Sequence, residues 1–415
     1  MGSDVIYPRF AEAALVEALA DTPVVLLHGP RQCGKTTLAR GVGAGRDYGY
    51  FSLDDEATLA AATTDPVGFV ADLPQRVILD EVQRAPGIFT AVKSAVDRDR
   101  RPGRFLLTGS ANVLLVPTLA DSLAGRMGII RLHPLAQCEL EEAPPRFLER
   151  LFAGDFKARS AERLGVALAE RIAAGGYPPA LVRPTPRRQQ AWYRDYVESL
   201  VQRDVRDLAR IASLDILPRL LSLAASQTAR LINVSDLASP FRLSRPTIRD
   251  YVTLLERVFL LEELPPWHSN RLSRLIKTPK LHLTDTGIAC ALIGFDGAAL
   301  HADRVVLGQL LETFVLQELR RQASWHDQEL RFHHFRDKDG VEVDIVLERD
   351  ARQVAGVEVK ASASVTAADF RGLRKLGEAV GKRFAAGVVL YDGEAALPFG
   401  EGMYALPIRT LWENT

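Results

Sequence analysis

The sequence has little cysteine and no excess of charge of either sign. Only three cysteines occur among 415 residues, and Cys33, Cys138 and Cys290 lie far apart without CxxC spacing, which argues against a disulfide framework or a zinc site. Lysine plus arginine number 52, as do aspartate plus glutamate. The balance excludes attraction of the whole protein to nucleic acid or to an acidic membrane as an explanation of function.

Long apolar runs are also missing. The longest uncharged run, residues 105–120, contains several polar side chains and is shorter than the roughly 18 apolar residues of a membrane-spanning helix. The N-terminus has no basic head followed by an apolar stretch, so we expect no signal peptide. These absences predict a cytoplasmic protein without a membrane partner, and its length predicts several domains.

The most specific motif present is a phosphate-binding loop. Residues 29–36 fit G-x-x-x-x-G-K-[ST] without substitution, after the apolar run 24–28 and before a helix-forming stretch. The backbone N–H groups of such a loop hold phosphates, Lys35 can reach the outer phosphates, and Thr36 can hold Mg²⁺. The expected nucleotide-binding residues are Gly29, Pro30, Arg31, Gln32, Cys33, Gly34, Lys35, Thr36 and Thr37.

Two acidic residues follow a second apolar strand, residues 76–79. Ligands of open α/β sheets bind at the carboxyl ends of the strands, so we expect Asp80 to hold Mg²⁺ and Glu81 to orient or deprotonate the attacking water. A third strand, residues 104–108, ends near Ser110 and Asn112. We favour Ser110 as the side chain between the carboxylates and the γ-phosphate, with Asn112 as the rival.

Two further points bear on the nucleotide. The chain has four asparagines and no Asn-Lys-x-Asp arrangement by which many GTPases read guanine, so ATP is favoured over GTP. Arg126 precedes another apolar strand, residues 128–132. It is a candidate to meet a γ-phosphate of its own subunit or of a neighbour in an oligomer, and a surface ion pair is the alternative.

The strings GPRQCGKTTL, RVILDEVQ, LLTGSAN and LAGRMGIIRLHPL occur in this order. They resemble the AAA-type ATPase domain of a widespread bacterial and archaeal family that carries a C-terminal region of unknown function. The resemblance extends over most of the chain. It implies a five-stranded parallel sheet, ATP hydrolysis with Mg²⁺, and the roles given above for Lys35, Thr36, Asp80, Glu81 and Arg126.

The middle of the chain favours helices and a helix-turn-helix. In residues 213–264, Ser244 is placed to cap a helix with Pro246 in its first turn. One apolar stripe runs from Ile248 to Phe259 at helical spacing and leaves Arg245 and Arg249 facing outward. This outline resembles a winged helix that could enter a DNA groove.

A basic stretch, residues 271–280, follows this helix. It carries Arg271, Arg274, Lys277 and Lys280, with no acidic residue from 267 to 282. We expect these cations to contact phosphates as a wing. The competing interpretation is that the segment binds a protein or a neighbouring domain.

The C-terminal third contains an acidic hairpin. Because strand residues alternate between faces, Glu342 and Asp344 share one face of the strand 340–347, and Glu358 and Lys360 share one face of the strand 355–360. Two carboxylates can hold Mg²⁺ or Mn²⁺, and a lysine beside them can activate water. Asp344, Glu358 and Lys360 are therefore catalytic candidates, and Asp344 and Glu358 are also candidate metal ligands.

This pattern resembles the D…(D/E)xK core of restriction-endonuclease-like nucleases. The preceding acidic helix, residues 307–319, offers Glu312 as the matching metal-binding glutamate and Glu318 as its rival. His333 and His334 lack a third ligand at suitable spacing and are interpreted as strand residues. A binding module without cleavage activity remains the alternative.

The predicted fold class is α/β with several domains. We expect a P-loop AAA core with a parallel sheet (1–140), a helical lid (141–212), a winged-helix-like domain (213–285) and a restriction-endonuclease-like α/β domain (286–415). The first functional hypothesis is an ATPase, binding ATP and Mg²⁺, that couples ATP state to DNA binding or processing. The second is an ATP-gated regulator that binds another protein and carries an inactive nuclease-like domain.

Overall fold

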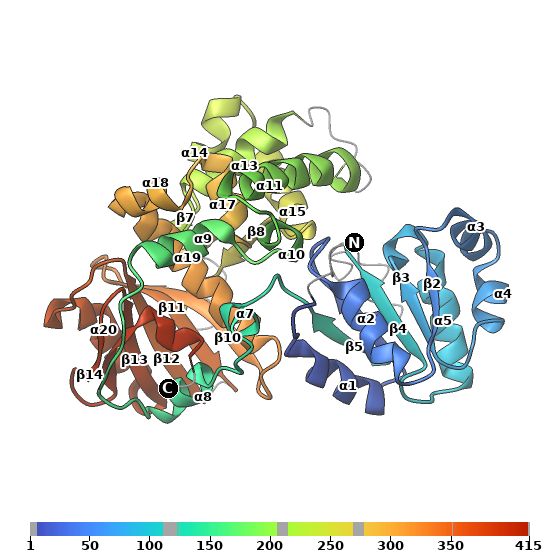
Figure 1. Ribbon diagram of the computed structural model, residues 1–415, viewed down its shortest axis with the longest axis horizontal. Helices are drawn as coiled ribbons and strands as arrows, with labels where there is room; N and C mark the ends of the chain where they lie inside the picture. The colour runs from blue at the N-terminus through green and yellow to red at the C-terminus, as the bar shows by residue number, and fades with distance from the viewer. Residues whose placement is uncertain are drawn as a thin grey trace. The chain divides into compact units, whose positions relative to one another are not determined.

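A computed structural model describes residues 6–110, 123, 125–205, 215–268, 278–350 and 352–413 of the protein. Two compact units are present in the chain (Figure 1). The N-terminal unit comprises Ile6–Leu135 with Leu255–Phe259, and the C-terminal unit includes Ala136–Leu254 and Leu260–Thr415. None of the helices in the described ranges combines the length and the apolar character that crossing a bilayer demands.

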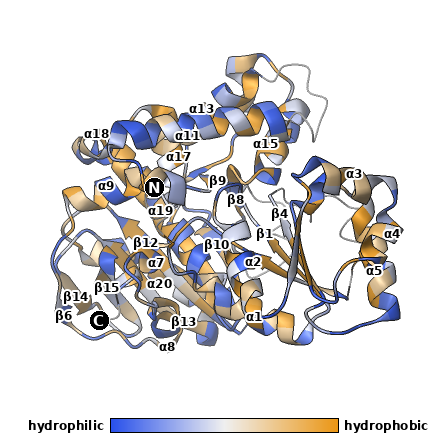
Figure 2. Cartoon of the chain, turned by 45° about the vertical axis from the view of Figure 1, so that its right-hand side comes forward, coloured by the Kyte–Doolittle hydropathy of each residue, from blue (hydrophilic) through white to orange (hydrophobic). Residues whose placement is uncertain are grey.

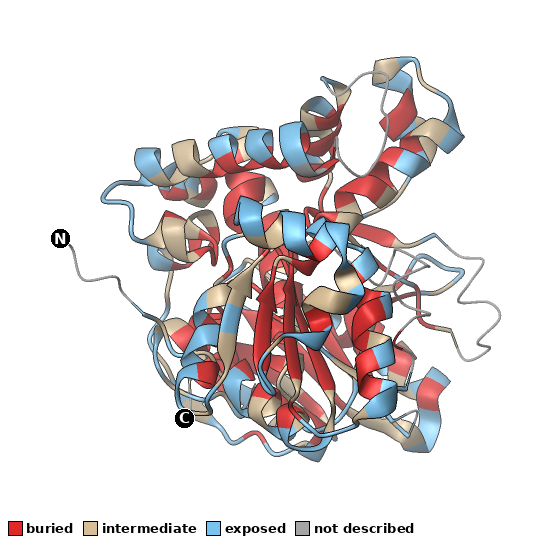
Figure 3. Cartoon of the chain, turned by 90° about the vertical axis from the view of Figure 1, so that its right-hand side faces the viewer, coloured by how far each residue is buried: buried red, intermediate tan, exposed pale blue. Residues whose placement is uncertain are grey.

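A five-stranded parallel sheet forms the core of the N-terminal unit, in the order β2-β3-β4-β1-β5. Its strands are β1 (Val24–His28), β2 (Gly49–Ser52), β3 (Val77–Asp80), β4 (Phe105–Gly109) and β5 (Met127–Arg131). Hydrophobic residues dominate β1, β3 and β4 (Figure 2), and these three strands are buried along their whole length (Figure 3). The strands predicted from the apolar runs and the implied five-stranded sheet are confirmed.

The helices of this unit connect the parallel strands. They are α1 (Ala11–Asp21), α2 (Lys35–Ala44), α3 (Glu56–Thr64), α4 (Pro66–Ala71) and α5 (Gly87–Arg98). The carboxylate of Asp55 accepts the Thr58 N–H at 2.9 Å and that of Asp65 accepts the Gly68 N–H at 2.9 Å. These caps explain where α3 and α4 begin, because the first N–H groups of a helix have no partner within it.

The first part of the C-terminal unit is helical. Its elements are α7 (Gln137–Leu140), α8 (Phe147–Ala153), β6 (Arg159–Ser160), α9 (Val166–Ala174), α10 (Pro178–Leu181) and α11 (Pro186–Leu200). The expected lid, residues 141–212, lies here rather than in a unit of its own. Its principal contacts are with later residues of the same unit: α9 with the helices α17 (Thr286–Ile293) and α18 (Gly297–Ala302), and β6 with a C-terminal strand.

Three helices and a small sheet follow. They are α13 (Ile216–Ser226), β7 (Arg230–Leu231), α14 (Val234–Ala238), α15 (Arg245–Arg257), β8 (Leu261–Leu264) and β9 (Lys280–Leu283), with strand order β7-β9-β8. The Thr247 N–H donates to the Ser244 hydroxyl at 3.3 Å. The apolar stripe from Ile248 to Phe259 is buried and Arg245 and Arg249 are exposed, so the predicted cap and stripe of α15 are confirmed.

A seven-stranded mixed sheet completes the C-terminal unit, in the order β10-β11-β12-β13-β15-β14-β6. Its later strands are β10 (Leu330–Arg336), β11 (Glu342–Arg349), β12 (Gln353–Lys360), β13 (Phe384–Tyr391), β14 (Ala395–Pro398) and β15 (Met403–Pro407), and its helices include α19 (Arg304–Ala323) and α20 (Arg371–Val380). β11 and β12 pair antiparallel, as the hairpin prediction requires. His333 and His334 lie in β10, as expected for strand residues.

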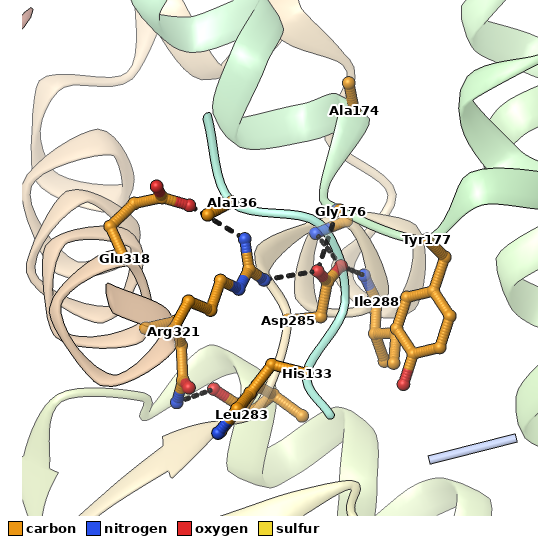
Figure 4. Close-up of polar contacts among 12 residues, drawn as sticks. His133, Ala136, Ala174, Gly176, Tyr177, Leu283, Asp285, Ile288, Glu318 and Arg321 are labelled. Carbon is orange, nitrogen blue, oxygen red and sulfur yellow. Dashed lines mark hydrogen bonds and ion pairs between the residues drawn. The ribbon is translucent and has the colours of Figure 1, made fainter. Parts of the chain in front are cut away.

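A buried ion network joins distant segments of the C-terminal unit (Figure 4). Arg321 of α19 pairs with Asp285 at 2.9 Å and with Glu318 at 2.8 Å, and all three side chains are nearly inaccessible to solvent. Asp285 also accepts the Gly176 N–H at 2.8 Å, and Glu318 accepts the Gln137 N–H at 2.8 Å. Glu318 therefore has a structural role, and its candidacy as a metal-binding glutamate is wrong.

Arg321→Met is expected to destabilise the C-terminal unit by about 3–5 kcal/mol, because it leaves two buried carboxylates without their counter-charge. All four tryptophans lie in this unit, so urea unfolding followed by tryptophan fluorescence measures the effect directly. The control is Arg331→Met, which breaks the exposed pair with Glu329 and is expected to cost about 0–1 kcal/mol. Equal losses in both variants would contradict the assignment.

Candidate nucleotide site

The phosphate loop connects β1 to α2, as the sequence predicts. Gly34 adopts a left-handed backbone conformation (φ 101°) immediately before α2, which begins at Lys35. Gly29 has φ 155°, and a Cβ there would lie 2.1 Å from the Leu132 carbonyl oxygen. Glycine is required at both positions by geometry, since other residues rarely take such conformations. The remaining predicted residues, Pro30, Arg31, Gln32 and Cys33, form the loop between these glycines, and Thr36 and Thr37 follow in α2.

Lys35 lies over the loop that precedes it. Its ammonium donates to the Gly29 carbonyl at 3.1 Å and to the Pro30 carbonyl at 2.8 Å, and the side chain is buried. The charge is thereby held at the loop whose N–H groups are suited to phosphate. The predicted role of Lys35, reaching the outer phosphates, stays a prediction.

Arg9 supports the loop from outside the motif. Its guanidinium donates to the Cys33 carbonyl at 2.6 Å and to the His133 carbonyl at 2.7 Å. The arginine therefore ties the loop to the segment after β5. Sequence reasoning missed Arg9, because it lies 24 residues before Cys33 and belongs to no recognisable pattern.

Asp80 is the centre of the polar contacts at the carboxyl end of β3. Thr36 Oγ1 lies 3.1 Å and 3.0 Å from its two carboxylate oxygens, and the Tyr50 hydroxyl donates to Oδ2 at 2.8 Å. The Thr108 hydroxyl donates to Oδ1. Burial and the Asp80 carboxylate raise the pKa of Tyr50 to about 12, so this hydroxyl keeps its proton at neutral pH. Tyr50 and Thr108 were not singled out by the sequence, although each lies in a strand beside β3.

Glu81 lies beside Ser110, as predicted. The Ser110 hydroxyl donates to Glu81 Oε2 at 2.7 Å, and the Gln83 amide contacts both Glu81 and, at 2.9 Å, the Ser110 hydroxyl. Glu81 has a left-handed backbone conformation (φ 59°), which is uncommon for a residue other than glycine. Gln83 is a further residue that sequence reasoning missed. The rival of Ser110, Asn112, lies outside the described residues.

The donor atoms at Thr36 and Asp80 fit a magnesium ion. A hydroxyl and a carboxylate are within 3.1 Å of each other at the start of α2, and oxygen is the ligand type that Mg²⁺ prefers, usually shared with water and substrate phosphates. These two residues would hold the ion, and when bound it would neutralise charge on the phosphate oxygens.

Arg126 is not brought to the phosphate loop of its own chain. It immediately precedes β5, whose first residue Met127 pairs with Val24, whereas the loop begins after His28 at the other end of β1. Val24 and His28, at the two ends of β1, are four residues apart, which is about 13 Å at 3.3 Å per strand residue. Arg126 instead pairs with Asp97 at 2.6 Å. The expectation of a γ-phosphate contact within the same subunit is wrong, because the phosphate loop lies at the opposite edge of the parallel sheet.

The C-terminal carboxylates meet a lysine that was expected elsewhere. Lys280 of β9 lies 2.7 Å from Glu312 and 3.5 Å from Asp344, and its side chain is 4% exposed. The expectation that Lys280 contacts phosphate as part of a wing is wrong, because the ammonium is paired with these carboxylates in the interior. Arg271, Arg274 and Lys277 lie outside the described residues.

Glu358 and Lys360 lie on one face of β12, as predicted. Lys360 donates to Glu358 Oε1 at 2.8 Å, and the Val359 N–H donates to Asp344 Oδ2 at 2.9 Å. Burial, with the nearby Asp344 charge, raises the pKa of Glu358 to about 8, and the same two causes raise the pKa of Glu312 well above its ordinary value. The structure thus gathers the carboxylates that the hairpin pattern predicted.

The expected metal-ligand set of Glu312, Asp344 and Glu358 is nevertheless not formed. Within the described residues, no group of three or more His, Cys, Asp or Glu side chains is arranged to hold a metal ion. The physical reason is the Lys280 ammonium, which is shared by two of the three carboxylates.

Comparison with known families finds a match for the part of the chain that holds the site. Residues 21–141, which include the phosphate loop, match the family model described as an AAA domain. Residues 166–299 and 307–411 match two models described as domains of unknown function, DUF8612 and DUF4143.

Relatives with similar sequences span nearly the whole chain. Uncharacterized protein Mb2031c of Mycobacterium bovis and Uncharacterized protein Rv2008c of Mycobacterium tuberculosis are each 29% identical over 399 residues, covering 96% of this chain and 83% of the relative.

Solved structures are more distant. The Walker-type ATPase PABY2304 of Pyrococcus abyssi is 17% identical, with a TM-score of 0.43 over 69% of this chain and 96% of its own. The RuvB Holliday junction branch migration motor of Thermotoga maritima is 19% identical, with a TM-score of 0.27 over 61% of this chain and 89% of its own. Neither score reaches 0.5, so neither likeness carries an argument about this chain.

The stability of the N-terminal unit is expected to depend on pH through His28, which lies directly before the loop. Burial, with the charges of Arg131 and Lys35, lowers its pKa from 6.5 to about 3. A lowered pKa means that neutral His28 favours the fold above pH 6.5 and that this stability is lost as the pH falls toward 3. Hydrogen exchange of peptides covering β1, measured from pH 7 to pH 4 and corrected for intrinsic rates, should show less acid-induced loss of protection in His28→Leu than in the wild type. Identical pH profiles would contradict this prediction.

Proposed function

We propose that the N-terminal unit binds ATP with Mg²⁺ and hydrolyses it. The observation that carries the proposal is the convergence of Thr36, Asp80, Glu81 and Ser110, from α2, β3 and β4, at the edge of the sheet where the phosphate loop begins. Phosphoryl transfer requires positioning and charge stabilisation more than covalent chemistry. The oxygens and hydroxyls gathered here are suited to both.

Each side chain has a distinct role in this proposal. Lys35 and the loop N–H groups bind the outer phosphates, and Glu81 accepts a proton from the attacking water or orients it. Ser110 and Gln83 hold the Glu81 carboxylate in place through the contacts described above. Arg126, directed away from its own phosphate loop, is proposed to act only in an oligomer, at a neighbouring subunit's nucleotide. ATP is favoured over GTP because the guanine-reading Asn-Lys-x-Asp arrangement is absent from the sequence.

Two substitutions separate binding from hydrolysis. Lys35→Ala is expected to weaken binding of Mg·ATP by at least about tenfold in calorimetry, since the ammonium is lost from the phosphate site. Glu81→Gln is expected to keep binding and to lower kcat by about 10²-fold or more, because the amide cannot accept the proton. Lys93→Ala on α5 is the matched control and should leave both quantities unchanged. Undiminished hydrolysis in Glu81→Gln would contradict the role of Glu81, and undiminished binding in Lys35→Ala would contradict the site.

A second candidate function is nucleic-acid binding by the segment from α13 to β9, coupled to the ATP state of the N-terminal unit. The order of three helices and a three-stranded antiparallel sheet fits a winged helix, in which the last helix is the one that reads DNA. Arg245 and Arg249 are exposed on α15 and line an open groove of about 850 Å³. Asp250 and Glu263 line the same groove, so acidic side chains partly offset the charge of the two arginines.

The double variant Arg245→Ala/Arg249→Ala is expected to weaken binding of a duplex DNA and to reduce the slope of log K against log salt by about 2, since roughly 0.9 counterion is released per phosphate contact. Fluorescence anisotropy at several salt concentrations measures this slope. Arg331→Ala, an exposed arginine of β10, is the control. No salt-dependent binding by the wild type would overturn DNA binding and favour the second hypothesis, a regulator that engages a protein.

The two functional hypotheses also differ in the role that they give to the C-terminal domain. A nuclease-like fold is supported by the order of α19 and the hairpin β11–β12 and by the placement of Asp344, Glu358 and Lys360. Cleavage by such a site requires a divalent cation between carboxylates. The function of this domain therefore depends on whether Glu312, Asp344 and Glu358 accept such a cation.

A further inference from the structure

The carboxylate cluster of the C-terminal unit, defined as Glu312, Asp344 and Glu358, is built around an ammonium group. Lys280 reaches it from β9, a strand of the small sheet, and contacts Glu312 on α19 and Asp344 on β11. The side chains of Glu312 and Asp344 are each 14% exposed, against 4% for Lys280. A cation placed between these two carboxylates would have to displace the ammonium.

The other oxygens of the cluster are largely engaged as well. Asp344 Oδ2 accepts the Val359 N–H, and Glu358 Oε1 accepts from Lys360. Glu358 Oε2 is buried and has no hydrogen-bond partner. One orphaned oxygen does not make a site for Mg²⁺, which requires near-octahedral oxygen coordination at about 2.0–2.1 Å.

The formal charges lead to the same conclusion. Counted with all five groups ionised, three carboxylates and two ammonium groups, from Lys280 and Lys360, sum to −1, so a divalent cation would bring the cluster to +1. Without the Lys280 charge the sum is −2, which a divalent cation balances. An uncompensated charge is costly in a poorly solvated position, so the cluster as built disfavours the metal and a cluster without Lys280 favours it.

We propose that Lys280 is a tethered counter-ion that takes the place of a divalent cation, so that this nuclease-like site binds no metal and cleaves no nucleic acid. The same contacts give the cluster a different use. They fasten β9, and with it the three-stranded sheet β7-β9-β8, to α19 and β11 inside the C-terminal unit. This inference is independent of ATP hydrolysis, because it concerns residues of the C-terminal unit alone.

The test is a titration with MnCl₂ in the absence of nucleotide, read by calorimetry and by the unfolding temperature in tryptophan fluorescence. The wild type and Asp344→Asn are expected to respond to MnCl₂ in the same way. Neither should show heat of binding that depends on Asp344, and Mn²⁺ should raise the unfolding temperature of neither. Lys280→Met is expected to unfold at a lower temperature in EDTA, to regain stability with Mn²⁺ and to bind Mn²⁺ at least about tenfold more tightly than the wild type. Lys280→Met/Asp344→Asn should lose that gain.

Lys375→Met is the matched control, since Lys375 also pairs with two carboxylates, Asp337 and Asp339, in a more exposed position. It should gain no Mn²⁺ binding. Binding of Mn²⁺ by the wild type that disappears in Asp344→Asn would overturn the proposal, as would a Lys280→Met protein that folds but gains no affinity. If Lys280→Met does not fold, the wild type and Asp344→Asn still decide, and an unfolding temperature that Mn²⁺ leaves unchanged in each of these two proteins supports the tethered counter-ion.

Discussion

The parallel alignment of β1, β3 and β4 is the constraint on which the nucleotide site depends. In a parallel sheet the carboxyl ends of all strands lie at one edge. The strand alignment alone therefore brings together the loop after β1, the acidic pair after β3 and the serine after β4. The contacts of Asp80 with Thr36 and of Glu81 with Ser110 are consequences of this alignment. The same alignment carries Arg126 to the opposite edge, where it pairs with Asp97.

Buried charge organises the C-terminal unit. Arg321 holds Asp285 and Glu318, and Lys280 holds Glu312 and Asp344. In both places a cation from one element joins carboxylates from others, because an ion removed from water must find its counter-charge nearby. Such pairs contribute little net stability compared with apolar packing, but they are costly to break. They therefore specify which elements lie together.

Local pattern was sufficient for much of the fold and for the phosphate loop. The strands of the five-stranded sheet, the cap at Ser244 and the hairpin that brings Asp344 to Glu358 follow from rules that act over a few residues. Arg9, Tyr50 and Gln83 were missed because their roles arise only after folding. Lys280 was misassigned because its neighbours are basic, whereas its partners lie 32 and 64 residues away and no composition of the segment reveals them.

Two sites in one chain share carboxylates and lysines, and their difference lies in where the ammonium is anchored. Lys35 donates to backbone carbonyls of its own loop, so Asp80 and Glu81 keep oxygens whose contacts with the described residues are to hydroxyl and amide groups. Those neutral donors can be exchanged for a metal ion or water. Lys280 donates to the carboxylates themselves, and a full charge is bound there already. Residue type alone thus does not distinguish a reactive acidic cluster from a structural one. The position of the nearest fixed cation distinguishes them.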